Sequence, residues 1–185
     1  MVADRPAPQA LTRAGASGRR HHGPQGPGVK AQIDSPQRSE GQELKDAWIA
    51  LLAPFSFQWF CTFTFATNVH PEQGFKTFRR FSNELNRRLY GRRWERSAHG
   101  GVFWIVALER QKRGVVHFHA LLGAVDDLNG MANRFEWMKR WQALAGFARI
   151  EAIRDNQAAR RYVTKYVVKG GDIEFSKNLD RSQRA

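Results

Sequence analysis

The chain has 185 residues, a net charge of +13 and a single cysteine, Cys61. This length suits one folded domain with room for a tail. One cysteine excludes an intrachain disulfide and a cysteine-based zinc site. The sequence contains neither a secretory leader nor an apolar stretch of about 18 residues, so we expect a cytoplasmic protein without membrane partners.

Residues 1–43 are rich in proline and glycine and contain few large apolar side chains. Such a segment buries too little apolar surface to offset the entropy of folding, so we predict a disordered basic tail here. The folded domain is predicted over residues 44–175, and a polar C-terminal tail over 176–185.

The hydrophobic pattern predicts strands where it has period two and helices where apolar residues recur at three- and four-residue steps. Two adjacent strands joined by a polar turn predict an antiparallel hairpin. The whole order predicts an α+β fold, a central antiparallel β-sheet flanked by α-helices. In chain order the predicted elements are a strand over 59–65, a helix over 75–89 ended by Gly91, strands over 102–109 and 115–122, a helix over 132–144, a strand over 147–153 and a helix over 156–169.

Pairs of basic residues alternate with tryptophans throughout the predicted domain. Basic patches mixed with aromatic rings suit a polyanion whose bases can stack, namely single-stranded nucleic acid. A solvated basic surface without a partner is the alternative. No glycine-rich phosphate-binding loop occurs, so we expect no nucleotide cofactor. The residues concerned are Arg79-Arg80, Arg87-Arg88, Arg92-Arg93, Lys139-Arg140 and Arg160-Arg161, with Trp59, Trp94, Trp104, Trp137 and Trp141.

His117 and His119 alternate with Phe118 in the predicted strand over 115–122. Because successive strand side chains point to opposite faces, the two imidazoles share a face, with Cα atoms about 6–7 Å apart. They can converge on one divalent metal ion, and Glu109, across the predicted hairpin, is the candidate third ligand. Such a set tolerates Mn²⁺ or Mg²⁺, the metals that we expect, and would also accept Zn²⁺, Co²⁺ or Ni²⁺. The alternative is two polar residues on an exposed sheet face.

Tyr162 and Tyr166 lie one turn apart in the last predicted helix, and each is followed three residues later by a lysine, Lys165 or Lys169. On a helix the two tyrosines share a face. A neighbouring ammonium group favours the phenolate or holds a phosphate, as attack on a phosphodiester requires. The alternative is that both tyrosines belong to the buried face of an amphipathic helix.

Three short motifs together resemble the HUH endonucleases, and among them the two-tyrosine rolling-circle replication initiators of phages and plasmids. His117-Phe118-His119 resembles the HUH motif, the run over 60–65 is similar to the initiators' first strand motif, and the run over 162–169 resembles their tyrosine motif. The resemblance implies an HUH nuclease domain with a ferredoxin- or RRM-like sandwich. It also implies metal ligation by both histidines, with Glu109.

The resemblance further implies that a tyrosine attacks single-stranded DNA at a replication origin and leaves a 5′-phosphotyrosine and a free 3′-OH. Tyr166 is the favoured first nucleophile. Host DNA polymerase and helicase are the implied partners. The expected DNA contacts are Thr62, Thr64, Arg160 and Arg161.

Two alternatives to a replication initiator remain open at this point. An HUH transposase or relaxase uses the same chemistry, although relaxases usually place the tyrosine before the histidines. A non-catalytic single-stranded nucleic-acid-binding module explains the charge and the tryptophans, but gives no reason for the histidines or the tyrosine-lysine pairs. A metal requirement separates an enzyme from a binding module.

Overall fold

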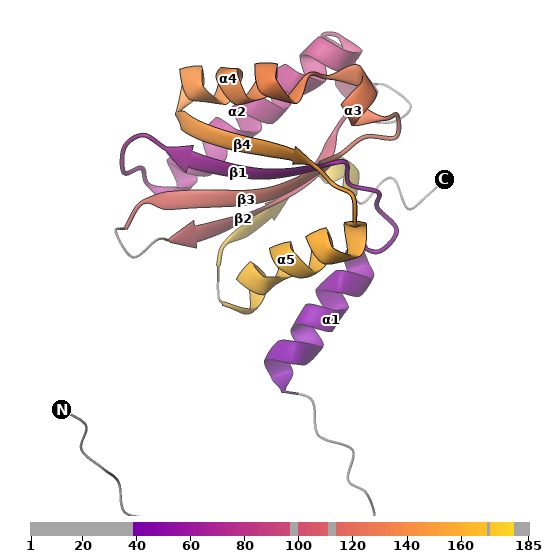
Figure 1. The fold of residues 1–185 in the computed structure, drawn as a ribbon, viewed down its shortest axis with the longest axis vertical. Coiled ribbons are helices and arrows are strands. Elements are labelled where there is room, and N and C mark those ends of the chain that lie inside the picture. The colour runs from indigo at the N-terminus through magenta and orange to yellow at the C-terminus, as the bar shows by residue number, and fades with distance from the viewer. Residues whose placement is uncertain (1–38, 97–99, 111–113, 170, 180–185) are drawn as a thin grey trace, which may run out of the picture. The chain divides into compact units, whose positions relative to one another are not determined.

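The computed structural model describes residues 39–96, 100–110, 114–169 and 171–179. In this part of the chain a five-stranded antiparallel sheet lies between two layers of helices (Figure 1). The predicted α+β fold with a central antiparallel sheet is therefore confirmed. None of the described helices combines the length and the apolar character that crossing a membrane requires.

The strands follow the order β4-β1-β3-β2-β5 across the sheet. The four long strands differ from their predicted ranges by at most one residue at either end, and β2 and β3 form the predicted antiparallel hairpin. The short β5, which pairs with β2, was not predicted because three residues are too few to show a period. The strands are β1 (Trp59–Phe65), β2 (Phe103–Arg110), β3 (Val116–Gly123), β4 (Gly146–Ala152) and β5 (Ile173–Phe175).

Helices α2 and α4 cover one face of the sheet, and α1 and α5 pack together on the other (Figure 1). Gly91 ends α2 as predicted: its φ is 79°, a left-handed conformation that glycine adopts without strain. The helices are α1 (Glu40–Leu52), α2 (Pro71–Tyr90), α3 (Leu128–Met131), α4 (Arg134–Leu144) and α5 (Asn156–Val168).

Secondary structure in the described residues extends beyond the predicted domain at both ends. Helix α1 begins at Glu40, so 40–43 are helical where a disordered tail was predicted. A short 3₁₀ helix, Lys177–Leu179, lies in the predicted polar tail, where Leu179 is buried. Both corrections depend on tertiary contacts: α1 packs on α5 through its later turns, so that 40–43 extend a helix stabilised further along, and the 3₁₀ helix packs on β2. The rest of the two predicted tails, 1–38 and 180–185, lies outside the described residues.

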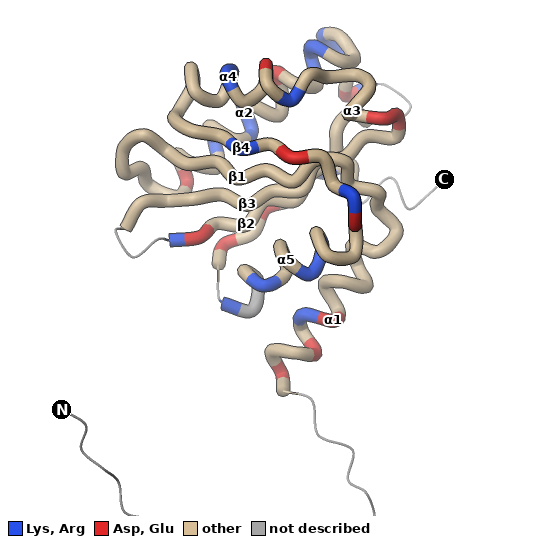
Figure 2. The backbone as a smooth tube through the Cα atoms, viewed as in Figure 1, with Lys and Arg blue, Asp and Glu red and all other residues tan. Residues whose placement is uncertain are grey.

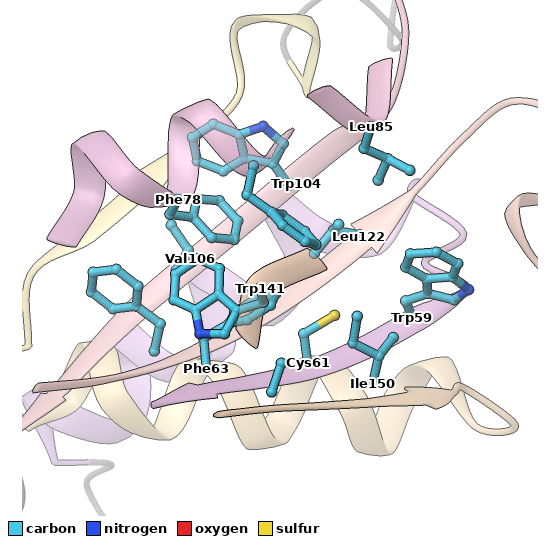
Figure 3. Close-up of a cluster of buried hydrophobic side chains, with 14 of the residues drawn as sticks. Trp59, Cys61, Phe63, Phe78, Leu85, Trp104, Val106, Leu122, Trp141 and Ile150 are labelled. Carbon is cyan, nitrogen blue, oxygen red and sulfur yellow. The ribbon is translucent and has the colours of Figure 1, made fainter. Parts of the chain in front are cut away.

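The larger core, between the sheet and helices α2 and α4, is dominated by aromatic rings (Figure 3). Trp59 and Trp141 are fully buried there, and Trp104 and Trp137 are at most 9% exposed. The prediction that these tryptophans stack on bases is therefore wrong for these four. They point to the core face of their strand or helix, where their large apolar area stabilises the fold.

Candidate nuclease site on the sheet

The two histidines lie on β3, in the middle of the sheet, with β1 on one side and β2 on the other. His117 is directly opposite Thr64 on β1 and Glu109 on β2. His119 is opposite Thr62. Residues opposite each other in antiparallel strands share a face, so these five side chains form one polar group. The predicted alignment of Glu109 with His117 is confirmed.

Each histidine ring is held by a threonine of β1. Thr64 Oγ1 lies 3.1 Å from Nδ1 of His117, and Thr62 Oγ1 lies 3.4 Å from Nδ1 of His119. In both cases the contact engages Nδ1. The threonines therefore orient the rings and leave the two Nε2 atoms for other partners.

Glu109 forms a hydrogen bond with His119, the histidine diagonal to it, rather than with His117. The distance from Glu109 Oε2 to His119 Nε2 is 2.9 Å. Burial lowers the pKa of His119 below its ordinary value, against the opposing effect of Glu109. Burial, followed by the neighbouring His119, also lowers the pKa of His117. Both imidazoles are therefore neutral at pH 7, which is the form that ligates metals.

Two imidazoles and a carboxylate are a donor set that suits a divalent metal with open positions for phosphate oxygens. The three side chains do not converge on a common point for a metal ion, because the carboxylate of Glu109 is hydrogen-bonded to His119 Nε2. Accordingly, no three His, Cys, Asp or Glu side chains in the described part of the chain have the arrangement of a metal site. The donor chemistry fits, and one hydrogen bond would have to be exchanged for metal bonds.

Helix α5 brings both tyrosines to the histidines. The ring of Tyr166 stacks on His119, with centroids 4.5 Å apart and planes at 7°. The Tyr166 hydroxyl donates a hydrogen bond to Tyr162 Oη over 3.0 Å. Tyr162 in turn meets the ring of Phe60 edge-on at 5.1 Å. The predicted shared face of the two tyrosines is thus confirmed, and this face is directed at the metal-ligand candidates.

The two tyrosines differ in environment although they are one turn apart. Tyr166 is 3% exposed, whereas Tyr162 is 41% exposed. Burial, then the hydrogen bond and charge of Tyr162, raises the pKa of Tyr166 far above its ordinary value. The phenolate of Tyr166 is therefore disfavoured in this arrangement, and Tyr162 is the phenol that is open to solvent.

The predicted basic residues divide into those that line the site and those that do not. Lys165 Nζ lies 5.6 Å from the Tyr162 ring centroid and 5.9 Å from that of Tyr166. Lys169 lines a surface pocket of about 310 Å³ together with Tyr166 and Glu109. This pocket connects the second tyrosine-lysine pair to the carboxylate.

The expected DNA contacts Arg160 and Arg161 differ in their surroundings. Arg160 donates hydrogen bonds to the carbonyl oxygen of Ala53 at 2.8 Å and to that of Asn156 at 3.0 Å, so it ties α5 to the end of α1. Arg161 is exposed, and the described residues show no hydrogen-bond partner for its side chain. Of the two arginines, only Arg161 has an exposed side chain.

Sequence reasoning missed Phe60, whose ring contacts Tyr162 and faces the ring of His119 with centroids 6.3 Å apart and planes at 23°. It also missed the open face of β4, where Phe147 and Arg149 lie in line with Thr64 and Thr62. Strand periodicity could have identified these residues, because alternate positions of a strand share a face of the sheet. Phe60, Thr62 and Thr64 occupy alternate positions of one strand, and Phe147 and Arg149 do so on another.

A protein-family model, that of the replication-associated protein ORF2 family, matches residues 58–171. This range exceeds half of the chain and contains strands β1 to β4 and helix α5. The chain belongs to the replication-associated protein ORF2 family. Searches of curated proteins and of solved structures returned no match. Membership of this replication-associated family assigns the protein to DNA replication, and the match includes the histidines, Glu109 and both tyrosines.

Proposed function

We propose that this protein nicks and rejoins single-stranded DNA at a replication origin through a 5′-phosphotyrosine, and so initiates rolling-circle replication of a plasmid or phage. The observation that carries the proposal is the stacking of Tyr166 on His119 beside the exposed Tyr162. Two potential nucleophiles thus adjoin a His-His-Glu set. Family membership supports the replication role, and the HUH resemblance supports the chemistry.

In the proposed reaction a tyrosine oxygen attacks a DNA phosphorus and the bond from phosphorus to the 3′ oxygen breaks. The phenol loses its proton and the departing 3′ oxygen gains one, so the products are a 5′-phosphotyrosine and a free 3′-OH. Because one phosphoester replaces another, the bond energy is conserved and ATP is not needed. The reverse attack by a 3′-OH rejoins the strand and releases the tyrosine.

His117, His119 and Glu109 would hold a divalent metal, Mn²⁺ or Mg²⁺, which when bound polarises the phosphodiester and stabilises the developing charge. Thr62 and Thr64 keep the imidazole rings oriented for this role through their contacts with Nδ1. To ligate such a metal, Glu109 would give up its hydrogen bond with His119.

Tyr162 is proposed to cleave first and Tyr166 second, which reverses the preference drawn from the sequence. Tyr162 is exposed, whereas Tyr166 is buried with a raised pKa. Lys165 lies near both rings and is suited to hold the scissile phosphate. The free 3′-OH then primes a host polymerase in the cytoplasm, and a host helicase unwinds the template.

The test is the trapping of a covalent protein–DNA adduct. Wild-type protein is mixed with a pool of labelled single-stranded DNA, with Mn²⁺ or with EDTA, and run on a denaturing gel. We expect a Mn²⁺-dependent adduct, strongly reduced in Tyr162→Phe, retained in Tyr166→Phe and absent from the double variant. Tyr90→Phe, which changes the third tyrosine of the chain on α2, is the matched control and should behave as wild type.

An adduct that persists in the double variant, or in EDTA, would contradict the proposed chemistry. Intact DNA binding without any adduct would favour the non-catalytic binding module. An HUH transposase would give the same adduct, and the two differ in the DNA that they use: an origin in a replicon, or the ends of a mobile element.

A further inference from the structure

The face of β4 that points toward the tyrosine side of the sheet is left uncovered. Helix α5 packs on β2 and β3, whereas β4 forms the opposite edge of the sheet (Figure 1). Phe147, on this edge strand, is 65% exposed. Ala148 and Ile150, which alternate with it, are buried on the other face. An exposed phenylalanine on an edge strand therefore needs an explanation.

The register of the sheet aligns this open face with the candidate site. Phe147 pairs with Thr64, which pairs with His117, so the three residues form one row across three strands. Arg149 pairs with Thr62, which pairs with His119, and forms the next row. With neighbouring strands about 4.8 Å apart, Phe147 and Arg149 each lie about 10 Å from a histidine of the site.

We propose that Phe147 and Arg149, with Thr62 and Thr64, form a strip that binds single-stranded DNA. The bound DNA would cross the sheet along this strip to reach the tyrosines. In this strip Phe147 stacks on an unpaired base and Arg149 contacts a phosphate. The proposal rests on the proposed function for the identity of the nucleic acid, and it adds a binding site beyond the nicking residues.

The chemistry of the strip favours single-stranded over duplex nucleic acid. An aromatic ring binds a base by stacking only where the base is unpaired and accessible. An adjacent cationic side chain can then contact a phosphate of the DNA backbone. The chain's net charge of +13 complements such a ligand. Arg149 contacts Glu151 over 2.8 Å, but both side chains are largely solvent-exposed, so a phosphate competes readily with this weak pair.

The strip is tested by fluorescence anisotropy with a labelled single-stranded oligonucleotide in EDTA, where no cleavage occurs. We expect Phe147→Ala to weaken binding about five-fold or more, and Phe147→Trp to restore it, because a larger ring also stacks. The matched control is Phe135→Ala on α4, which is 66% exposed on an element that packs against the opposite face of the sheet. It should bind as wild type.

Arg149 has its own readout, the salt dependence of binding. A lost phosphate contact lowers the slope of log K against log salt concentration by about 0.7 for a single strand. Arg149→Ala should show this change, whereas Phe147→Ala should weaken binding without changing the slope. Glu151→Gln should tighten binding, because it removes a negative charge that competes for Arg149.

Three outcomes would contradict the proposed strip. They are an unchanged affinity of Phe147→Ala for the oligonucleotide, an equal loss of affinity in Phe135→Ala, and no binding by wild type. A wild-type dimer that Phe147→Ala converts to a monomer, with DNA affinity unchanged, would assign this surface to a second copy of the chain. The nicking proposal fails separately: it fails if wild type binds DNA and forms no adduct, an outcome that leaves the strip intact.

Discussion

At the scale of single residues, His119 connects four elements of the structure. It lies on β3, its Nε2 contacts Glu109 of β2 at 2.9 Å, and its ring stacks on Tyr166 of α5. Thr62 of β1 contacts its remaining ring nitrogen. A side chain shared by so many partners is held in one orientation, as a metal ligand must be.

The role of the histidines is tested by the double variant His117→Ala/His119→Ala. We expect it to lose adduct formation, because two ligands of the proposed metal site are removed, and to keep its affinity for single-stranded DNA within a few-fold. Phosphate contacts come from lysine and arginine, which the variant retains. Adduct gels with Mn²⁺ and anisotropy in EDTA measure the two effects.

His70→Ala, at the exposed start of α2, controls for the loss of an imidazole. A thermal unfolding curve verifies that the double variant is folded. Wild-type levels of adduct in the double variant would refute the assignment of these histidines as metal ligands.

At the scale of elements, the position of α5 decides which groups face the histidines. This helix is anchored at its first turn, where the Asn156 side chain bonds both the amide nitrogen and the carbonyl oxygen of Phe57, at 2.8 and 3.0 Å. Arg160 then bonds the end of α1. These contacts keep Tyr162 and Tyr166 over the sheet, so stability and the proposed nicking activity depend on the same helix.

Arg160 and Arg161 are adjacent in the sequence and should have separable effects. Arg160→Ala removes charge-assisted hydrogen bonds to backbone carbonyls, and we expect a loss of about 1–2 kcal/mol in the free energy of unfolding. Arg161→Ala should change stability by less than about 0.5 kcal/mol, as is usual for a surface residue, and should weaken DNA binding more than Arg160→Ala does.

Urea unfolding and anisotropy together check this pair of variants. If Arg161→Ala were the destabilising variant, or if Arg160→Ala alone weakened DNA binding at unchanged stability, the division of roles between the two arginines would be wrong.

At the scale of the whole molecule, basic residues are spread over α2, α4, α5 and the edge of the sheet rather than gathered in one element (Figure 2). Several of them on α2 and α4 are paired with carboxylates, as in the contacts of Glu84 with Arg80 and Arg140. The hydrogen bond with Arg140 is the main cause that lowers the pKa of Glu84. The remaining positive charge is available to a polyanion.

Affinity for single-stranded DNA should therefore fall steeply with salt. If about four or five phosphates are neutralised, the slope of log K against log salt concentration is about −3. Anisotropy titrations between low and physiological salt measure it, with the uncleaved oligonucleotide in EDTA. A flat titration would contradict a basic DNA-binding surface, whatever the outcome of the adduct test.

Much of the fold followed from local patterns, because period-two alternation in β1 and helical spacing in α2 report directly which side of an element is buried. The pairing of Glu109 with His117 also followed, since a hairpin brings neighbouring segments into register. Helix α1 and strand β5 did not follow, because their stability comes from packing on α5 and β2 rather than from their own sequence.

The sequence by itself therefore determined the strand that carries the histidines, the helix that carries the tyrosines and the donor chemistry of both. Only the tertiary structure decided that Tyr166 is buried against His119 while Tyr162 is exposed, that Arg160 bonds α1, and that four tryptophans fill the core. The physical reason is that periodicity assigns a residue to a face of its own element. What covers that face depends on segments far away in the chain.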